Sequence, residues 1–158
     1  MSSYLNFYLV PKKTRKMYDY NKDDGHTEIE VDLATGEPLL FMSYSRSNDI
    51  YQAYNETLNP VFIGMKEPQY SELTYENAKQ VVNEYEEDLN KTEERLKIDY
   101  KMLKEGGYSS ELWEDIHSME EYLKQQQKCV EELKHISGIV YEVTEGYTDF
   151  EKVLINVD

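Results

Sequence analysis

Two series of residues are arranged symmetrically about a glycine pair, Gly106-Gly107, in the middle of a long helical pattern. Within each series the spacing alternates between three and four residues, with one interruption, as in the seam of a coiled coil. Mirror symmetry predicts an antiparallel helical hairpin, because residues at equal distances from a turn meet across it. The two series are Ala78, Val82, Tyr85, Leu89, Thr92, Leu96 and Leu103, and then Leu112, Met119, Leu123, Gln126, Val130, Leu133 and Ser137.

The glycine pair is the predicted turn, since glycine weakens a helix interior and readily adopts turn conformations. Ser109 or Ser110 is expected to cap the returning helix. The hairpin is predicted over residues 74–136, with two helices of about thirty residues, or about 45 Å each. We expect its base, near Ala78 and Leu133, to pack on a sheet while the tip projects.

Several seam positions are polar, including Thr92 and Gln126, and heptad counting places Asp99 opposite Ile116. Polar seam residues weaken a coiled coil and can set its register. They can also mark a place where the hairpin bends or a partner inserts, and the sequence leaves both interpretations open.

The segments on either side of the hairpin, residues 1–70 and 136–158, are rich in strand patterns. Strands are predicted at 4–10, 28–33, 39–45, 138–144 and 150–157, with a short helix over 47–58. The strands at 28–33 and 39–45 are expected to form a hairpin, and Gly138 is expected to stop the second long helix. The predicted fold is therefore one α+β domain over residues 1–158, an antiparallel or mixed sheet with a long helical hairpin inserted.

The net charge of −15 disfavours direct binding to nucleic acid or to an anionic membrane, and permits binding to a basic protein surface. Cys129 is the only cysteine, so no internal disulfide can form. The chain shows neither a signal-peptide pattern nor a long apolar run. We therefore expect a cytoplasmic protein.

No pattern of a cofactor site, a metal site or a catalytic nucleophile is present. Two Glu-x-x-His patterns, Glu114 with His117 and Glu132 with His135, fall on the outer face of one predicted helix, too far apart to share a metal. We assign no catalytic, cofactor or metal residue and expect a non-enzymatic protein. A small hydrolase using sheet carboxylates and a metal is a third hypothesis, which divalent-metal binding would favour.

One stretch of the first long helix concentrates acidic residues at helical spacing. Such carboxylates can resemble a row of phosphates, so an acidic nucleic-acid mimic that inhibits a DNA- or RNA-binding protein is the second hypothesis. The alternative is a solvated surface, because lysines such as Lys91 and Lys97 are interspersed. The candidate residues are Glu84, Glu86, Glu87, Asp88, Glu93 and Glu94.

The leading hypothesis is an interaction protein that presents the acidic hairpin to a protein partner, with Tyr108 and Trp113 as contacts at the tip. Trp113 is equally well explained as a residue that closes the tip. An exposed helical pair can also dimerise into a four-helix bundle, so a homodimer is considered too. The basic cluster at Lys12, Lys13, Arg15 and Lys16 is either a loop that neutralises the acidic surface or a contact to phosphate or an acidic partner.

Residues 4–13 (YLNFYLVPKK) and 39–56 (LLFMSYSRSNDIYQAYNE) resemble small uncharacterised accessory proteins of bacteriophages and prophages. The resemblance covers about the first sixty residues and brings no catalytic motif. It implies a context in which such proteins bind a host or phage protein, some of them as inhibitors of nucleic-acid enzymes.

Overall fold

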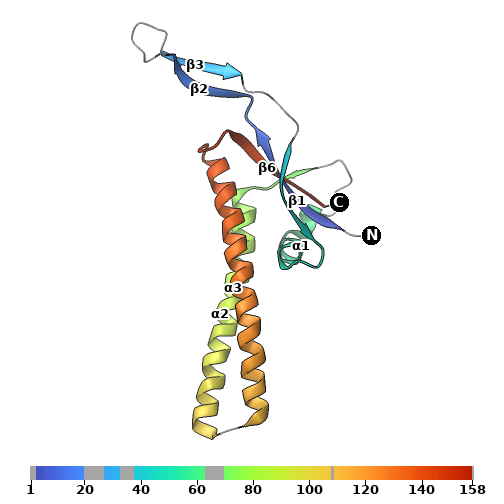
Figure 1. Ribbon diagram of the computed structural model, residues 1–158, viewed down its shortest axis with the longest axis vertical. Coiled ribbons are helices and arrows are strands. Elements are labelled where there is room, and N and C mark those ends of the chain that lie inside the picture. Colours follow the sequence, from blue (N-terminus) through green and yellow to red (C-terminus); the bar gives the residue numbers. More distant parts are fainter. Residues whose placement is uncertain (1–2, 20–26, 33–37, 63–69, 108, 158) are drawn as a thin grey trace.

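The computed structural model describes residues 3–19, 27–32, 38–62, 70–107 and 109–157 of the chain. It confirms the α+β class: a four-stranded antiparallel sheet built from the N- and C-terminal segments sits at the base of two long helices that pack against each other (Figure 1). A separate two-stranded sheet extends from the opposite side of the four-stranded one. None of the described helices is both long and apolar enough to cross a bilayer.

The four-stranded sheet has the strand order β4-β1-β6-β5. The strands span Tyr4–Pro11 (β1), Leu39–Ser45 (β4), Ser71–Glu72 (β5) and Phe150–Val157 (β6). Because side chains alternate along a strand, Leu5 and Phe7 of β1 point to the same face of the sheet, where both are fully buried. In the register between β1 and β6, Phe7 lies opposite Ile155. The strand predicted over residues 4–10 is confirmed, since β1 spans Tyr4–Pro11.

Side chains of three strands join in a polar row on the other face of the sheet. Asn6 lies opposite Ser43 on one side and Asn156 on the other. Ser43 donates a 2.7 Å hydrogen bond to the Asn6 side-chain oxygen, and the Asn6 amide donates a 3.1 Å bond to Asn156. Both asparagines are buried, so these bonds offset the cost of burying their amides.

The two long helices form the predicted hairpin, here called the arm. Helix α2 spans Tyr75–Gly106 and α3 spans Ser110–Thr144. Gly107 ends the first helix with φ +80°, a conformation that glycine adopts without strain. Ser109 caps the second helix by accepting a hydrogen bond from the Leu112 amide. All fourteen seam positions are buried or half-buried, and Ile116 fills the interruption at 1% exposure.

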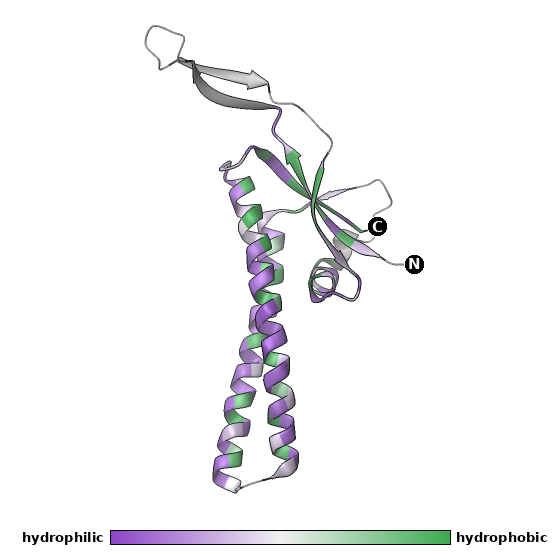
Figure 2. Ribbon diagram, in the orientation of Figure 1, coloured by the Kyte–Doolittle hydropathy of each residue, from purple (hydrophilic) through white to green (hydrophobic). Residues whose placement is uncertain are grey.

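The main core lies where the arm meets the sheet and α1, which spans Asp49–Phe62. Ala78 and Leu133 at the base of the arm are fully buried in one cluster with Leu5, Phe7 and Ile155, as predicted. In Figure 2, apolar residues are frequent in the coloured strands of the four-stranded sheet, whereas the arm is mostly hydrophilic with scattered apolar positions.

The predicted strand at 138–144 is wrong, because α3 continues to Thr144 and Gly138 does not stop it. Ile136, Val140 and Val143 recur at helical spacing and are all nearly fully buried. Their burial outweighs the strand preference of β-branched residues and the cost of about 1 kcal/mol for a helical glycine. Gly138 is exposed on the opposite side.

The predicted hairpin between 28–33 and 39–45 is also wrong. Strand β3, Thr27–Asp32, pairs with β2, Thr14–Asp19, whereas β4 pairs with β1. The turn expected between them falls largely on residues 33–37, outside the described ones. Strand β2 was not predicted and contains Arg15 and Lys16, so the basic cluster is only in part a loop. The Lys12 ammonium donates a hydrogen bond to the carbonyl oxygen of Gly146.

Candidate functional site

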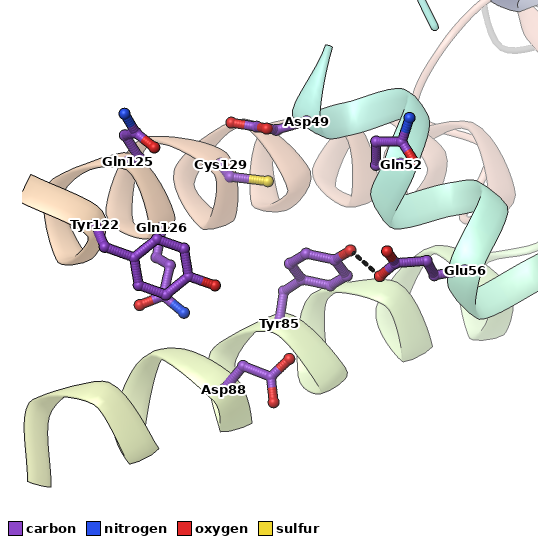
Figure 3. A pocket seen from close by; sticks show the side chains of 9 residues that line it. All are labelled: Asp49, Gln52, Glu56, Tyr85, Asp88, Tyr122, Gln125, Gln126 and Cys129. Carbon is purple, nitrogen blue, oxygen red and sulfur yellow. Dashed lines mark hydrogen bonds between the residues drawn. The ribbon is translucent and has the colours of Figure 1, made fainter. Parts of the chain in front are cut away.

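A pocket of about 250 Å³ opens where α1 meets both helices of the arm (Figure 3). Each of the three helices contributes side chains to its walls. They are Asp49, Gln52 and Glu56 from α1, Tyr85 and Asp88 from α2, and Tyr122, Gln125, Gln126 and Cys129 from α3.

Helical periodicity explains why α1 supplies the polar wall of this pocket. Ile50 and Ala53 face the core and are almost completely buried. Asp49, Gln52 and Glu56 are spaced three and four residues apart, so they share a neighbouring face of the same helix. One side of α1 therefore anchors the helix to the core while the next side presents two carboxylates to the arm.

On the arm, the pocket lies on one flank of the seam. Asp88 immediately precedes the seam residue Leu89, and Cys129 immediately precedes Val130. These equivalent heptad positions lie on the same flank of an antiparallel pair, which is why the two residues line one pocket. We call this flank, on which α1 packs, the α1 face of the arm.

The pocket is rich in hydrogen-bond acceptors, and none of the described residues that line it is basic. Asp49, Glu56 and Asp88 bring three carboxylates, and the lining residues that the structure describes include no Lys, Arg or His. No ion pair between described residues involves these three acids. The side-chain oxygen of Gln126 is buried without a hydrogen-bond partner. Such a site favours a cation that can donate several hydrogen bonds.

The pKa values of two lining residues reflect this environment. Burial, followed by a 2.6 Å hydrogen bond that the Tyr85 hydroxyl donates to Glu56, raises the pKa of Tyr85 well above its ordinary value. Burial and the nearby carboxylates of Asp49 and Glu132 raise the pKa of the Cys129 thiol to about 11. Cys129 is therefore a neutral thiol near pH 7, not an activated nucleophile.

The acidic residues singled out in the sequence do not form one continuous row of free carboxylates. Glu84 accepts a 2.9 Å hydrogen bond from Thr57, Glu86 pairs with Lys134 across the arm, and Glu87 pairs with Lys91 at 3.7 Å. Asp88 alone among the six lines the pocket; Glu93 is half-buried and Glu94 exposed.

Of the two residues predicted as partner contacts at the tip, the structure describes only Trp113. Tyr108 lies outside the described residues. Trp113 is 50% exposed in the first turns of α3, so its ring is accessible at the end of the arm. His117 and His135 are exposed on α3, as their outer heptad positions predicted. Among the described residues, no three His, Cys, Asp or Glu side chains are placed so that they could hold a metal ion together.

Sequence reasoning missed most of the pocket. Of its lining residues, only Asp88 was a candidate, and Gln126 stood out as a polar residue in an apolar seam. The α1 residues Asp49 and Glu56 carry no signal of their own, because their role depends on how α1 docks on the arm. Comparison of the chain with protein-family models, with curated proteins and with solved structures finds no match.

Proposed function

We propose that this chain is a non-enzymatic, cytoplasmic interaction protein, and that its pocket accepts a lysine or arginine side chain from a basic segment of a protein partner. The observation that carries the proposal is the composition of the lining: three carboxylates and a buried, unpartnered amide oxygen, with no basic side chain among the described residues that line the pocket. A cationic side chain would supply a positive charge that balances the three carboxylates and a donor for the unpartnered oxygen.

The size of the pocket supports a side chain as the occupant. About 250 Å³ is below the range of sites that enclose drug-sized ligands. In Figure 3, the ring of Tyr85 lies near Glu56 and Asp88, and the ring of Tyr122 is drawn next to Gln126. An extended cation could lie against a tyrosine face while its charged end reaches Asp49, Glu56 or Asp88. Arginine fits best, because its planar fork matches carboxylate geometry.

The net charge of the whole molecule also favours a basic partner. A net charge of −15 attracts a basic partner over distances of about 8–10 Å at physiological salt and speeds its encounter. The resemblance of residues 4–13 and 39–56 to phage accessory proteins would place that partner among host or phage proteins. No observation on the described residues favours the nucleic-acid mimic or the hydrolase over this proposal.

The test uses a ten-residue Gly/Ser peptide that contains one arginine, and the same peptide with neutral, isosteric citrulline. Binding is followed through backbone amide shifts of the isotope-labelled protein. We expect shifts centred on the pocket residues with the arginine peptide, and none with the citrulline peptide. Asp88→Asn should weaken binding about tenfold, the effect of losing about 1.4 kcal/mol from one charged contact.

Glu94→Gln provides the matched control, since it removes the same charge from an exposed position on the same helix. Its affinity should stay within about twofold of the wild type, as expected for a screened surface charge. Equal weakening by Asp88→Asn and Glu94→Gln would show that the peptide senses only the overall charge, and the proposal would fail.

A further inference from the structure

A second cavity, of about 200 Å³, adjoins the pocket along α3. It shares three lining residues with the pocket, namely Asp49, Gln125 and Cys129. The residues that it adds are Asn48 and Ile50 of α1 and Lys128 and Glu132 of α3. The two spaces therefore follow one another along the junction of α1 with α3. We call the second one the adjoining cavity.

The adjoining cavity differs from the pocket in its hydrogen-bonding groups. The carboxylate of Glu132 accepts a 2.6 Å hydrogen bond from the Tyr44 hydroxyl. The side-chain oxygen of Asn48 accepts a 2.8 Å bond from the Ile50 amide. Among the described residues that line either space, Lys128 alone is basic. The pocket thus offers unused acceptors, whereas the adjoining cavity offers an ammonium donor.

Lys128 is not held by another side chain in the described part of the protein, where no ion pair includes it. Glu132 follows it by four residues on α3, but a lysine that precedes a glutamate is the weaker order for such a helical pair. The Glu132 carboxylate is also already bonded to Tyr44. Because Lys128 is exposed and its side chain is long and flexible, its ammonium can turn toward Asp49 or toward a bound partner.

Asp49 connects the two spaces electrostatically, since it lines both of them, and Figure 3 shows it beside Cys129. In the free protein its carboxylate attracts the ammonium of Lys128 across the adjoining cavity. An arginine in the pocket would pair with Asp49 and leave Lys128 with one carboxylate there, the Tyr44-bonded Glu132. A carboxylate on the partner would then be attracted to Lys128, and a second base on the partner would be repelled.

We propose that Lys128 is a specificity-determining residue, which selects an arginine with an acidic neighbour and discriminates against an arginine within a run of bases. The inference rests on the proposed function, because an arginine of the partner must first enter the pocket. The two charges of the partner are then matched in order, the arginine by the carboxylates of the pocket and the acid by Lys128 in the adjoining cavity.

The net charge of −15 gives such a residue a clear effect. A strongly acidic chain attracts basic segments in general, and the most basic of them most strongly. Specificity among these segments is gained from a local element that disfavours the wrong one. Lys128 places a positive charge beside the pocket, where it meets the residues next to the bound arginine.

Three ten-residue Gly/Ser peptides with one arginine test this selection. The residues two positions before and two positions after the arginine are both glutamate, both lysine or both glutamine. Side chains two positions apart share one face of an extended chain, so these neighbours can reach the adjoining cavity in either chain direction. Calorimetric titration measures their dissociation constants with the wild type and with Lys128→Gln. Lys124→Gln is the matched control, because Lys124 is exposed one turn earlier on α3 and lines neither space.

The quantity to compare is the dissociation constant of the lysine-flanked peptide divided by that of the glutamate-flanked peptide. We expect Lys128→Gln to lower this ratio about fivefold, because one exposed attraction and one exposed repulsion are lost together. Lys128→Glu should lower it further, since the sign of the charge is reversed. Lys124→Gln should change it by less than about twofold, as expected for a screened surface charge.

The outcomes separate this inference from the proposed function. Equal ratios in the wild type and Lys128→Gln, or equal changes in Lys128→Gln and Lys124→Gln, would overturn the role of Lys128 while arginine binding stands. If the glutamine-flanked peptide binds no better than the same peptide with citrulline in place of arginine, the proposed function itself fails, and the role of Lys128 fails with it.

Discussion

The hydroxyl of Tyr85 donates a 2.6 Å hydrogen bond to the carboxylate of Glu56, and this bond links α2 of the arm to α1. Tyr85 is at once a seam residue of the arm and a wall of the pocket. The same side chain thus joins the packing of the hairpin to the shape of the candidate binding site.

Replacing Tyr85 by phenylalanine should lower the free energy of unfolding by about 1–2 kcal/mol, because it removes a hydrogen bond to a charged group and keeps the ring. Urea unfolding measures the change. Tyr122→Phe is the matched control, since Tyr122 is a largely exposed tyrosine of the same pocket and should change stability by less than about 0.5 kcal/mol. Equal effects of the two substitutions would contradict a structural role for the Tyr85–Glu56 bond.

The two glycines of the turn should respond in opposite directions to alanine. Gly107 has φ +80°, so Gly107→Ala should destabilise the protein by about 1 kcal/mol. Gly106 ends α2 with a negative φ and no atom within 4 Å of an added Cβ, so Gly106→Ala should stabilise by about 0.4–1 kcal/mol. Thermal unfolding of the two variants checks the difference, and a destabilising Gly106→Ala would show that the helix end is not as described.

A substitution that creates a cavity should affect local stability at the distal end of the arm and global stability at its base. Ile116→Ala and Leu133→Ala each remove a buried side chain and should cost about 2–4 kcal/mol locally. Ile116 lies outside the main core, so its loss should mainly speed amide hydrogen exchange in the distal arm. Leu133 belongs to the core cluster, so its loss should lower global stability. Faster exchange of the sheet amides in Ile116→Ala would contradict this separation.

Cys129 should react slowly with iodoacetamide in the folded protein. Its pKa is raised from 9.0 to about 11, so at pH 8 the reactive thiolate is about a hundredfold less abundant than in the unfolded chain, and burial slows the reaction further. Mass spectrometry with and without urea measures both rates. The raised pKa also means that this group's contribution to stability is present below about pH 9 and decreases as the pH rises toward 11. Similar rates in both states would contradict the buried, acid-flanked thiol.

Much of the arm was predictable because its information is local and repeated. The seam recurs along α2 and α3, and Gly107 and Ser109 mark the turn and the cap with residue types suited to those roles. Errors began where local preference and tertiary burial disagree: Val140 and Val143 favour strands by type but are buried as part of a helix.

The amino-acid sequence by itself determined the helical hairpin, its turn and the α+β class, because a heptad pattern mirrored about a turn admits one pairing of helices. Tertiary structure alone decided that β4 pairs with β1 and that Asp49 and Glu56 face Asp88 across a pocket. Strand partners and pocket walls depend on how segments distant in the chain dock, and no local pattern encodes that docking. The candidate site lies at that junction of α1 with the arm.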